Sequence, residues 1–150
     1  MGFLTGKTAI ITGGGRAVLS NGECGSIGYG IATAYAKEGA NLVLTGRNVQ
    51  KLTDAKEELE KKYGIKVLPV QADVSAGADN EAIVQNVVKQ AIDTFGRIDV
   101  LINNAQASAS GVTIADHTTE QFDLAVYSGL YAAFYYMNCL LYTSDAADEL

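Results

Sequence analysis

The sequence is poor in the residues that cross-link a small protein or bind metals. Its 150 residues include 2 cysteines and 1 histidine. Two cysteines cannot form a disulfide framework, and Cys24 has no histidine near it in the sequence. The histidine, His117, has no cluster of cysteine, histidine and acidic residues around it at metal-site spacing. We therefore expect neither a disulfide-rich scaffold nor a metal centre.

Basic residues and long apolar runs are also scarce. Lys and Arg together number 11 against 17 Asp and Glu, a net charge of -6, so nucleic acid is not an expected partner. The sequence has no run of about 18 apolar residues, which argues against a membrane span. The N-terminus reaches a charge at Lys7 without the pattern of a secretory signal. With 48% hydrophobic and 19% charged residues, we expect a folded, globular, cytoplasmic chain.

Short β-branched runs alternate along the chain with longer stretches of helical periodicity. Strands are expected at residues 8–12, 42–44, 66–72 and 98–102. Helices are expected at residues 27–37, 49–63, 80–95 and from about 118 onward. Pro69 lacks a backbone donor and places the third strand near a sheet edge. Gly39, Gly64 and Gly96 end the first three helices. The alternating order predicts an α/β fold with parallel strands and right-handed crossovers.

Each expected helix has an apolar face that should pack on the sheet. The first face comprises Ile27, Ile31, Ala34 and Tyr35. The second comprises Val49, Leu52, Ala55, Leu59 and Tyr63, with the outer ion pairs Glu57–Lys61 and Glu58–Lys62. The third, which Asp79 should cap, comprises Val84, Val87, Val88, Ala91, Ile92 and Phe95. The last comprises Phe122, Ala125, Val126, Leu130, Ala133 and Phe134, beside a stripe of Tyr127, Tyr131 and Tyr135 expected in packing or a subunit interface.

A glycine-rich segment joins the first strand to the first helix. It begins with Thr12-Gly13-Gly14-Gly15-Arg16 and ends at Ser26-Ile27-Gly28. Glycines let the backbone turn tightly and approach phosphates, while the N–H groups and dipole of the following helix attract negative charge. In this strand-loop-helix context the pattern predicts a site for the pyrophosphate of a dinucleotide.

These motifs resemble those of the short-chain dehydrogenase/reductase family, from about Gly6 to Met137. The family motif Thr-Gly-x-x-x-Gly-x-Gly maps onto Thr12, Gly13 and Gly28, with Ser26 replacing the middle glycine and residues 17–25 inserted. Two further motifs match those beside the family's cofactor: Asp73-Val74, and Asn103-Asn104-Ala105-Gln106 for its Asn-Asn-Ala-Gly. The resemblance implies a Rossmann-type doubly wound parallel sheet in the order 3-2-1-4, incomplete in this chain. It also implies a cofactor site of Thr12, Gly13, Gly15, Arg16, Ser26, Ile27, Gly28, Arg47, Asp73, Val74, Asn103, Asn104 and Ala105.

The end of the second strand favours NADP(H) over NAD(H). An acidic residue there would accept the ribose 2′-hydroxyl of NAD and repel a 2′-phosphate. Gly46 stands at this position and Arg47 follows it. A guanidinium binds phosphate bidentately, and Arg16 in the glycine-rich loop is a second candidate, provided that the insertion leaves it at the cofactor.

The catalytic residues of the family have no counterpart here. Family members transfer hydride between the cofactor and a carbonyl or alcohol, with a Ser and with a Tyr whose pKa is lowered by a Lys four residues later. No Tyr of this chain has such a Lys, and the family's helical Asn corresponds to Gly129. The resemblance implies the N-terminal, cofactor-binding half of a homo-oligomeric enzyme, inactive by itself. Two alternatives stay open: a non-catalytic dinucleotide sensor, favoured by Gln106 and Gly129, and an enoyl-acyl reductase-like enzyme, favoured by the long glycine loop.

The last residues depart from the family pattern. Residues 139–150 can be back-translated into the sequence of a common transposon-based sequencing adapter. We therefore expect the N-terminal part of an NAD(P)-binding domain at residues 1–138 and a non-native tail at residues 139–150.

Overall fold

The computed structural model of the chain describes residues 2–143. Its sheet comprises β1 (Thr8–Thr12), β2 (Asn41–Gly46), β3 (Val67–Gln71) and β4 (Val100–Ile102). The strands are parallel and lie in the order β3-β2-β1-β4, which confirms the predicted α/β class and strand order. Pro69 lies in the edge strand β3, where its missing donor costs no ladder hydrogen bond.

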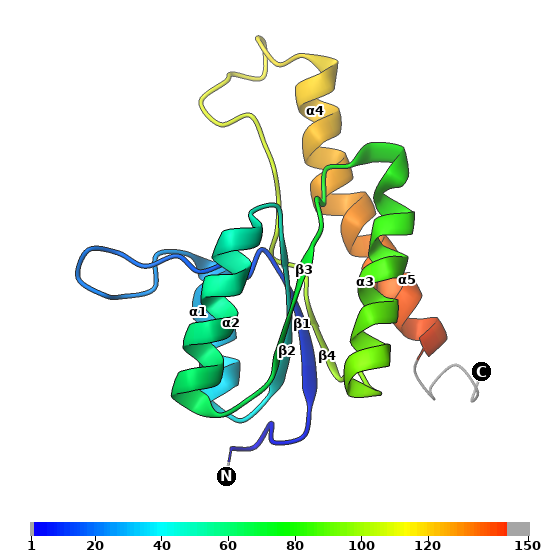
Figure 1. Cartoon of the computed structure of the whole chain (residues 1–150). Helices are drawn as coiled ribbons and strands as arrows, with labels where there is room; N and C mark the ends of the chain where they lie inside the picture. Colours follow the sequence, from blue (N-terminus) through cyan, green and yellow to red (C-terminus); the bar gives the residue numbers. More distant parts are fainter. Residues whose placement is uncertain (1, 144–150) are drawn as a thin grey trace.

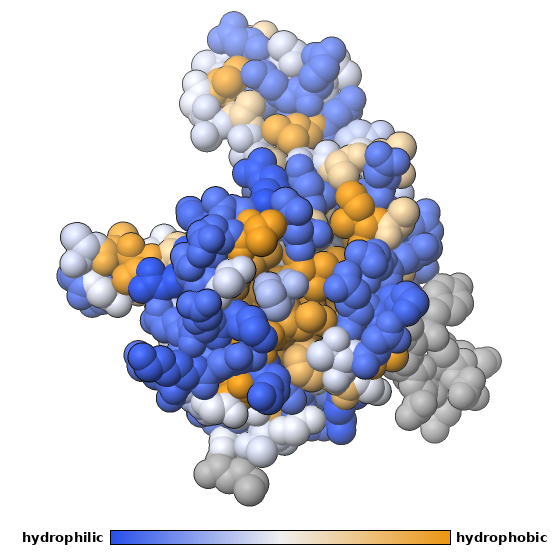
Figure 2. All heavy atoms as spheres, in the orientation of Figure 1, coloured by the Kyte–Doolittle hydropathy of each residue, from blue (hydrophilic) through white to orange (hydrophobic). Residues whose placement is uncertain are grey.

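Helices cover both faces of the sheet (Figure 1). One face packs against α1 (Ile27–Lys37) and α2 (Val49–Tyr63), and the other against α3 (Asn80–Phe95) and α5 (Ala132–Thr143). Successive strand residues alternate between the two cores. Ile11 belongs to the core under α1 and α2, and Ile10 to the core under α3 and α5. Burial on both faces explains why the strands are continuously apolar. Figure 2 shows an apolar strip between α2 and α3, over the edge strand.

The buried face of α1 matches the predicted one in part, since Ile31 and Tyr35 are half-buried against the core. Ile27 is 76% exposed and Ala34 is exposed as well. The buried residues of α1 are Gly28, Tyr29, Ala32 and Ala36. Close approach of the backbone selects this face, because a Cβ on Gly28 would lie 2.2 Å from the carbonyl oxygen of Gly13. The buried face of α1 therefore combines the small residues Gly28, Ala32 and Ala36 with one large side chain, Tyr29.

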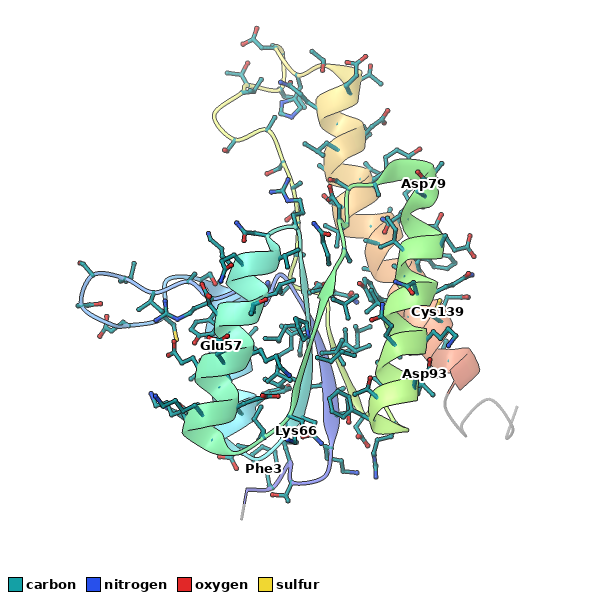
Figure 3. All side chains as sticks on the ribbon, in the orientation of Figure 1. Phe3, Glu57, Lys66, Asp79, Asp93 and Cys139 are labelled. Atoms are coloured by element: carbon teal, nitrogen blue, oxygen red, sulfur yellow. The ribbon has the colours of Figure 1, made fainter. Side chains whose placement is uncertain are left out.

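On α2 the predicted core residues Leu52, Ala55 and Leu59 are buried, whereas Val49 is exposed. The predicted ion pairs on this helix are wrong. Glu58 pairs with Arg16 of the glycine-rich loop, and exposed Glu57 carries no salt bridge among the described residues (Figure 3). The observed pair within α2 joins Lys56 to Glu60 at 2.9 Å. Lys56 also donates to the Val67 carbonyl at 2.8 Å, so a tertiary hydrogen bond selects this register.

The predicted capping of α3 by Asp79 is wrong. A 3-10 turn, η1 (Gly77–Asp79), runs directly into the helix, and within the described chain the Asp79 side chain makes no capping hydrogen bond. Its φ of -82° and ψ of -6° are close to helical values, whereas a cap needs an extended residue. Asp79 is exposed at the start of α3 (Figure 3), and the next residue, Asn80, is buried with its Nδ2 2.7 Å from the Val74 carbonyl.

The last helical segment has three parts: α4 (Thr119–Val126), a π-helical turn η2 (Tyr127–Tyr131) and α5. It begins as predicted, because Thr118 and Gln121 form a capping box. The predicted inward face is wrong, since Phe122, Leu130 and Phe134 are 59%, 68% and 53% exposed. Ser128, Ala132 and Tyr136 are buried instead. The π-helical turn adds residues to one turn and so rotates the face that α5 presents to α3.

The last helical segment is also long and apolar. The described part of the chain contains one helix, Thr119–Leu141, that is long and apolar enough to cross a membrane by length and composition alone. A single helix of this kind is weak support for a membrane span, because helices of soluble proteins also meet the criterion. The predicted boundary at residue 139 falls inside α5, and residues 144–150 of the predicted foreign tail lie outside the described residues.

Candidate functional site

The carboxyl ends of β1 and β4 are joined by side-chain hydrogen bonds. The hydroxyl oxygen of Thr12, at the end of β1, accepts from the backbone N–H groups of Asn104 and Ala105, both at 2.9 Å. In return the Asn104 side-chain Nδ2 donates to the Thr12 carbonyl at 2.8 Å. Three of the predicted site residues therefore form one rigid junction at the edge of the sheet where parallel α/β folds bind ligands.

The glycine-rich loop passes this junction with no room for side chains. Gly13 has a φ of +71°, and a Cβ there would lie 2.9 Å from Nδ2 of Asn104. The N–H groups of Gly13 and Gly14 both donate to the Thr45 carbonyl of β2, at 2.8 and 3.1 Å. A Cβ on Gly28 would collide with Gly13 and with Asn104 at 2.6 Å. The loop, the first turn of α1 and the end of β4 are therefore in direct backbone contact.

The first turn of α1 lies at this edge of the sheet. Ser26 is the N-cap residue, and its hydroxyl accepts from the Tyr29 N–H at 3.4 Å. No acidic residue occupies the first turn, so the positive end of the helix dipole is not neutralised by its own sequence. The start of α1 therefore retains the capacity to bind an anion that the sequence predicted.

The inserted residues between the glycine loop and α1 form a hairpin that projects from the body (Figure 1). Val18 and Cys24 form an antiparallel bridge. Leu19 N–H donates to the Glu23 carbonyl at 2.8 Å, and the turn closes at Gly22, whose φ is +84°. The nine inserted residues thus have a fixed local structure of their own, which leaves the flanking glycine loop and helix in contact.

Arg16, the last residue before the hairpin, is held against α2. Its backbone N–H donates to the Lys51 carbonyl at 2.8 Å, and its guanidinium Nε pairs with the Glu58 carboxylate. The hydrogen bond to Glu58 raises the pKa of Arg16, and the bond from Arg16 lowers the pKa of Glu58. Burial and the neighbouring Glu58 raise the pKa of Tyr29. Arg16 is thus engaged by a protein carboxylate, whereas Arg47 lines the cleft.

Two adjoining cavities extend along the sheet edge. The first, of about 280 Å³, lies over the ends of β2 and β3 and is lined by Gly13, Gly46, Arg47, Asp73 and Gln106 among others. The second, of about 460 Å³, lies between the end of β4 and the π-helical turn and is lined by Asn103, Gln106, Gly129 and Tyr136 among others. The residues common to both are Val74, Asn104, Ala105 and Gln106. Because they share these lining residues, the two cavities adjoin as one cleft.

Charged groups are concentrated in the smaller cavity. Burial raises the pKa of Asp73, but hydrogen bonds from the Ser75 hydroxyl and N–H and the nearby charge of Arg47 outweigh that effect, so the net shift is downward. The Ser75 hydroxyl lies 2.6 Å from Asp73 Oδ1. This end of the cleft therefore presents an ionised carboxylate and a guanidinium, which are groups that bind hydroxyls and phosphates.

The structure separates the predicted site residues into two sets. The residues lining the cleft are Thr12, Gly13, Arg47, Asp73, Val74, Asn103, Asn104 and Ala105. The residues outside its lining are Gly15, Arg16, Ser26, Ile27 and Gly28. Of the second set, Gly28 packs on Gly13 and Gly15 lies near Lys51. Their predicted contacts with a cofactor stay predictions, and the geometry assigns them to the framework of the loop.

The larger cavity contains a buried tyrosine that sequence reasoning missed. Tyr136 is 1% exposed, and burial raises the pKa of its phenol to about 12. Ser128 has a structural role, because its hydroxyl donates to the Leu124 carbonyl at 2.7 Å and accepts from the Ala107 N–H at 2.9 Å. Apolar helix patterning gave no signal for Tyr136, because the π-helical turn shifts the buried face. Within residues 2–143 no group of three His, Cys, Asp or Glu side chains could hold a metal ion.

Comparisons with known proteins agree with this geometry. A family model described as enoyl-(acyl carrier protein) reductase matches residues 22–144. The chain is 62% identical over 146 residues to a 12α-hydroxysteroid dehydrogenase of a Clostridium species, covering 97% of this chain and 54% of that protein. The chain spans about half the length of the curated relatives it matches, 54% and 44% for two of them.

Solved structures show the same fold. L-sorbose reductase from Gluconobacter frateurii, complexed with NADPH and L-sorbose, has a TM-score of 0.81 and 32% identity, covering 98% of this chain and 50% of its own. Alcohol dehydrogenase from Thermococcus sibiricus, complexed with 5-hydroxy-NADP, has a TM-score of 0.78 and 27% identity, covering 91% of this chain and 52% of its own. The family model matches most of the chain and the relatives share its fold, so the chain belongs to the short-chain dehydrogenase/reductase family.

Proposed function

We propose that the chain is the cofactor-binding half of an NADP(H)-dependent oxidoreductase that interconverts an alcohol and a carbonyl compound. The cleft over the carboxyl ends of the strands is the observation that carries this proposal. Arg47 and Asp73 line one of its two cavities and offer groups that bind phosphates and hydroxyls. The sequence has no Tyr followed four residues later by Lys, so we expect this chain to bind cofactor without turning over substrate.

NADP(H) is the proposed cofactor because of the residues at the end of β2. Gly46 leaves the position without a carboxylate, and Arg47 lines the smaller cavity. A carboxylate at this position would repel a 2′-phosphate, whereas a guanidinium binds it. Two related solved structures, an L-sorbose reductase and an alcohol dehydrogenase, are complexes with NADPH and an NADP derivative, which supports the choice.

The first prediction tests this preference. Substituting Arg47→Asp should weaken NADPH binding by about ten-fold or more, because a charge-assisted contact is lost and a repulsive charge is added. NADH binding should change much less. Titration of intrinsic tyrosine fluorescence or calorimetry with both cofactors measures the ratio. Unchanged discrimination in the variant would contradict the assignment of Arg47, whereas a wild-type chain that binds neither cofactor would contradict the proposed function.

The proposed substrate class rests on the similarity to a hydroxysteroid dehydrogenase. At 62% identity to a 12α-hydroxysteroid dehydrogenase, we propose that the whole protein acts on a hydroxyl or ketone of a steroid. The test assays the whole protein in parallel for NADP⁺ reduction with a 12-hydroxysteroid or a sugar alcohol, and for NADPH oxidation with an enoyl thioester. Preference for either of the last two would contradict it.

A non-catalytic dinucleotide sensor is the second candidate function. Gly129 replaces the helical Asn that the resemblance implies, and Gln106 replaces the last glycine of the Asn-Asn-Ala-Gly motif. Downstream sequence of the source gene separates the candidates. A Tyr-x-x-x-Lys motif would support the enzyme, and its absence the sensor. The same sequence tests the proposal that residues 139–150 are foreign, because an unbroken coding sequence through them would contradict it.

A further inference from the structure

The two departures from the family motifs, Gln106 and Gly129, lie against each other. Gln106 follows β4, and Gly129 lies in the π-helical turn. A Cβ on Gly129 would lie 3.5 Å from Nε2 of Gln106 and 3.8 Å from its Cδ and Cγ. These are ordinary van der Waals distances, so a side chain at residue 129 would contact the Gln106 side chain, and both residues are exposed. The Gln106 side chain therefore lies beside the position where the helix lacks one.

A hydrogen bond between Ser128 and Ala107, the residues next to Gly129 and Gln106, joins the two segments. Ser128 precedes Gly129 and is 2% exposed. Its hydroxyl accepts from the N–H of Ala107, the residue after Gln106, at 2.9 Å and donates to the Leu124 carbonyl at 2.7 Å. The loop and the π-helical turn are thus held in register directly beside the pair. A π-helical turn inside a longer helix is a frequent feature of functional sites.

Gln106 also stands where the two cavities meet. It lines both, whereas Gly129 lines the larger one alone. Arg47 and Asp73 mark one end of the cleft in the smaller cavity. A dinucleotide whose phosphorylated adenosine lies at Arg47 must pass Gln106 to place its nicotinamide riboside in the larger cavity. The Gln106 carboxamide offers two donors and an acceptor at that passage.

We propose that Gln106 is a specificity-determining residue that binds the nicotinamide riboside end of the cofactor, and that a side chain no larger than a methyl group at residue 129 leaves the space that Gln106 occupies. The inference rests on the proposed function, since it assumes a dinucleotide in the cleft. Amide and hydroxyl groups of that end are the partners that a carboxamide recognises. A side chain larger than a methyl group at residue 129 would occupy the space of the Gln106 side chain and displace it.

The test compares two ligands that differ in their nicotinamide end. NADPH spans the cleft, whereas adenosine 2′,5′-bisphosphate contains the 2′-phosphate without the nicotinamide riboside. In the 150-residue chain, Gln106→Ala should weaken NADPH binding by about three- to ten-fold, the equivalent of one or two lost hydrogen bonds. Binding of adenosine 2′,5′-bisphosphate should not change. Calorimetry of both ligands on wild type and variant gives the comparison.

Substitutions at residue 129 provide the matched control. Gly129→Ala adds a methyl group at 3.5 Å from its nearest neighbour and should retain NADPH affinity. Gly129→Leu should lose as much affinity as Gln106→Ala, because leucine takes the space of the carboxamide. In the double variant the two losses should not add, since both remove one contact. Thermal melts of every variant show whether it is folded.

The outcomes separate the inference from the function on which it rests. Loss of NADPH affinity alone, with the bisphosphate unchanged and the double variant no weaker, supports the proposal. Equal loss for both ligands would assign the pair a purely structural role, and unchanged NADPH affinity would remove any role in binding; either result overturns the inference while the proposed function stands. A folded wild-type chain that binds neither ligand overturns the proposed function and this inference with it.

Discussion

Two arginines follow strand ends in this chain, and the structure gives them different environments. Arg16 is paired with Glu58 on α2, while Arg47 lines the cleft beside Asp73. The sequence could identify both as candidate phosphate ligands, because both follow a strand that ends at the binding edge. It could not distinguish them, because Glu58 lies 42 residues from Arg16 and the contact exists only after α2 packs on the glycine loop.

This difference leads to the second prediction. Arg16→Ala should reduce NADPH affinity less than Arg47→Ala does, since the guanidinium of Arg16 already has a carboxylate partner. The thermal midpoint of Arg16→Ala should change little, because partly exposed ion pairs contribute little to stability. Parallel calorimetric titrations and melts measure both quantities. A larger affinity loss for Arg16→Ala than for Arg47→Ala would show that the cofactor displaces Glu58 and recruits Arg16.

Two glycines of the first turn of α1 provide the third prediction. A Cβ on Gly28 would lie 2.2 Å from the Gly13 carbonyl oxygen, whereas a Cβ on Gly30 would meet its nearest neighbour at 3.8 Å. Gly28→Ala should therefore destabilise the chain by about 1–3 kcal/mol through overpacking of backbone against backbone. Gly30→Ala is the matched control and should not be destabilising, since alanine favours helix. Urea denaturation of both variants makes the comparison, and equal stabilities would contradict the close approach.

At the scale of elements, one acidic residue joins the amino ends of β1 and β4. Asp99 accepts from the Thr8 N–H at 2.8 Å and from Arg97 Nε at 2.9 Å, and Lys7 Nζ lies 3.3 Å away. Hydrogen bonding to Arg97 is the largest of the effects that lower the pKa of Asp99 to about 2. The ordinary value is 3.8, so the folded state binds the Asp99 proton more weakly than the unfolded state.

The fourth prediction follows from that shift. Stabilisation by Asp99 should be fully present above about pH 4 and should be lost as the pH falls toward 2, because the unfolded chain then takes up the proton first. After allowance for solvent screening, the loss should be about 1–2 kcal/mol. The measured quantity is the difference in unfolding free energy between wild type and Asp99→Asn from pH 5 to 2. A difference that does not change with pH would contradict the role of the carboxylate.

The elements differ in how far the sequence could predict them. The central strands β1 and β2 were predictable because they are buried on both faces, so that Ile10 and Ile11 are both apolar although they face different cores. The face of α1 was predictable only in part, and that of the last helical segment was not. Gly28 is buried through backbone contact with Gly13. Because glycine has no side chain, a pattern of apolar side chains cannot reveal this contact. The π-helical turn at Tyr127–Tyr131 likewise breaks the period on which the prediction of the last face depended.

At the scale of the whole molecule, one side of the last helical segment is left uncovered. The large apolar side chains exposed along it include Phe122, Leu130, Phe134 and Met137, each more than half exposed. Tyr127, Tyr131 and Tyr135 stack beside them with ring centroids 5.2 and 6.1 Å apart. Among the described residues β4 pairs with β1 alone, so one edge of the sheet is also open. Apolar surface and an open edge together favour association with another polypeptide.

The fifth prediction is that the chain self-associates through this helical surface. Static light scattering should give a mass above that of the monomer that rises with concentration, and the double substitution Phe122→Lys with Phe134→Lys should lower it, because two charges would have to be desolvated at the contact. Ile114→Lys is the matched control: Ile114 is 89% exposed but lies in the preceding loop, and its substitution should leave the mass unchanged.

An exposed apolar helix can also bind a lipid surface. If the chain is monomeric without lipid and co-sediments with phosphatidylcholine vesicles, and if the same double substitution abolishes that binding, self-association is contradicted. The surface would then be assigned to a membrane.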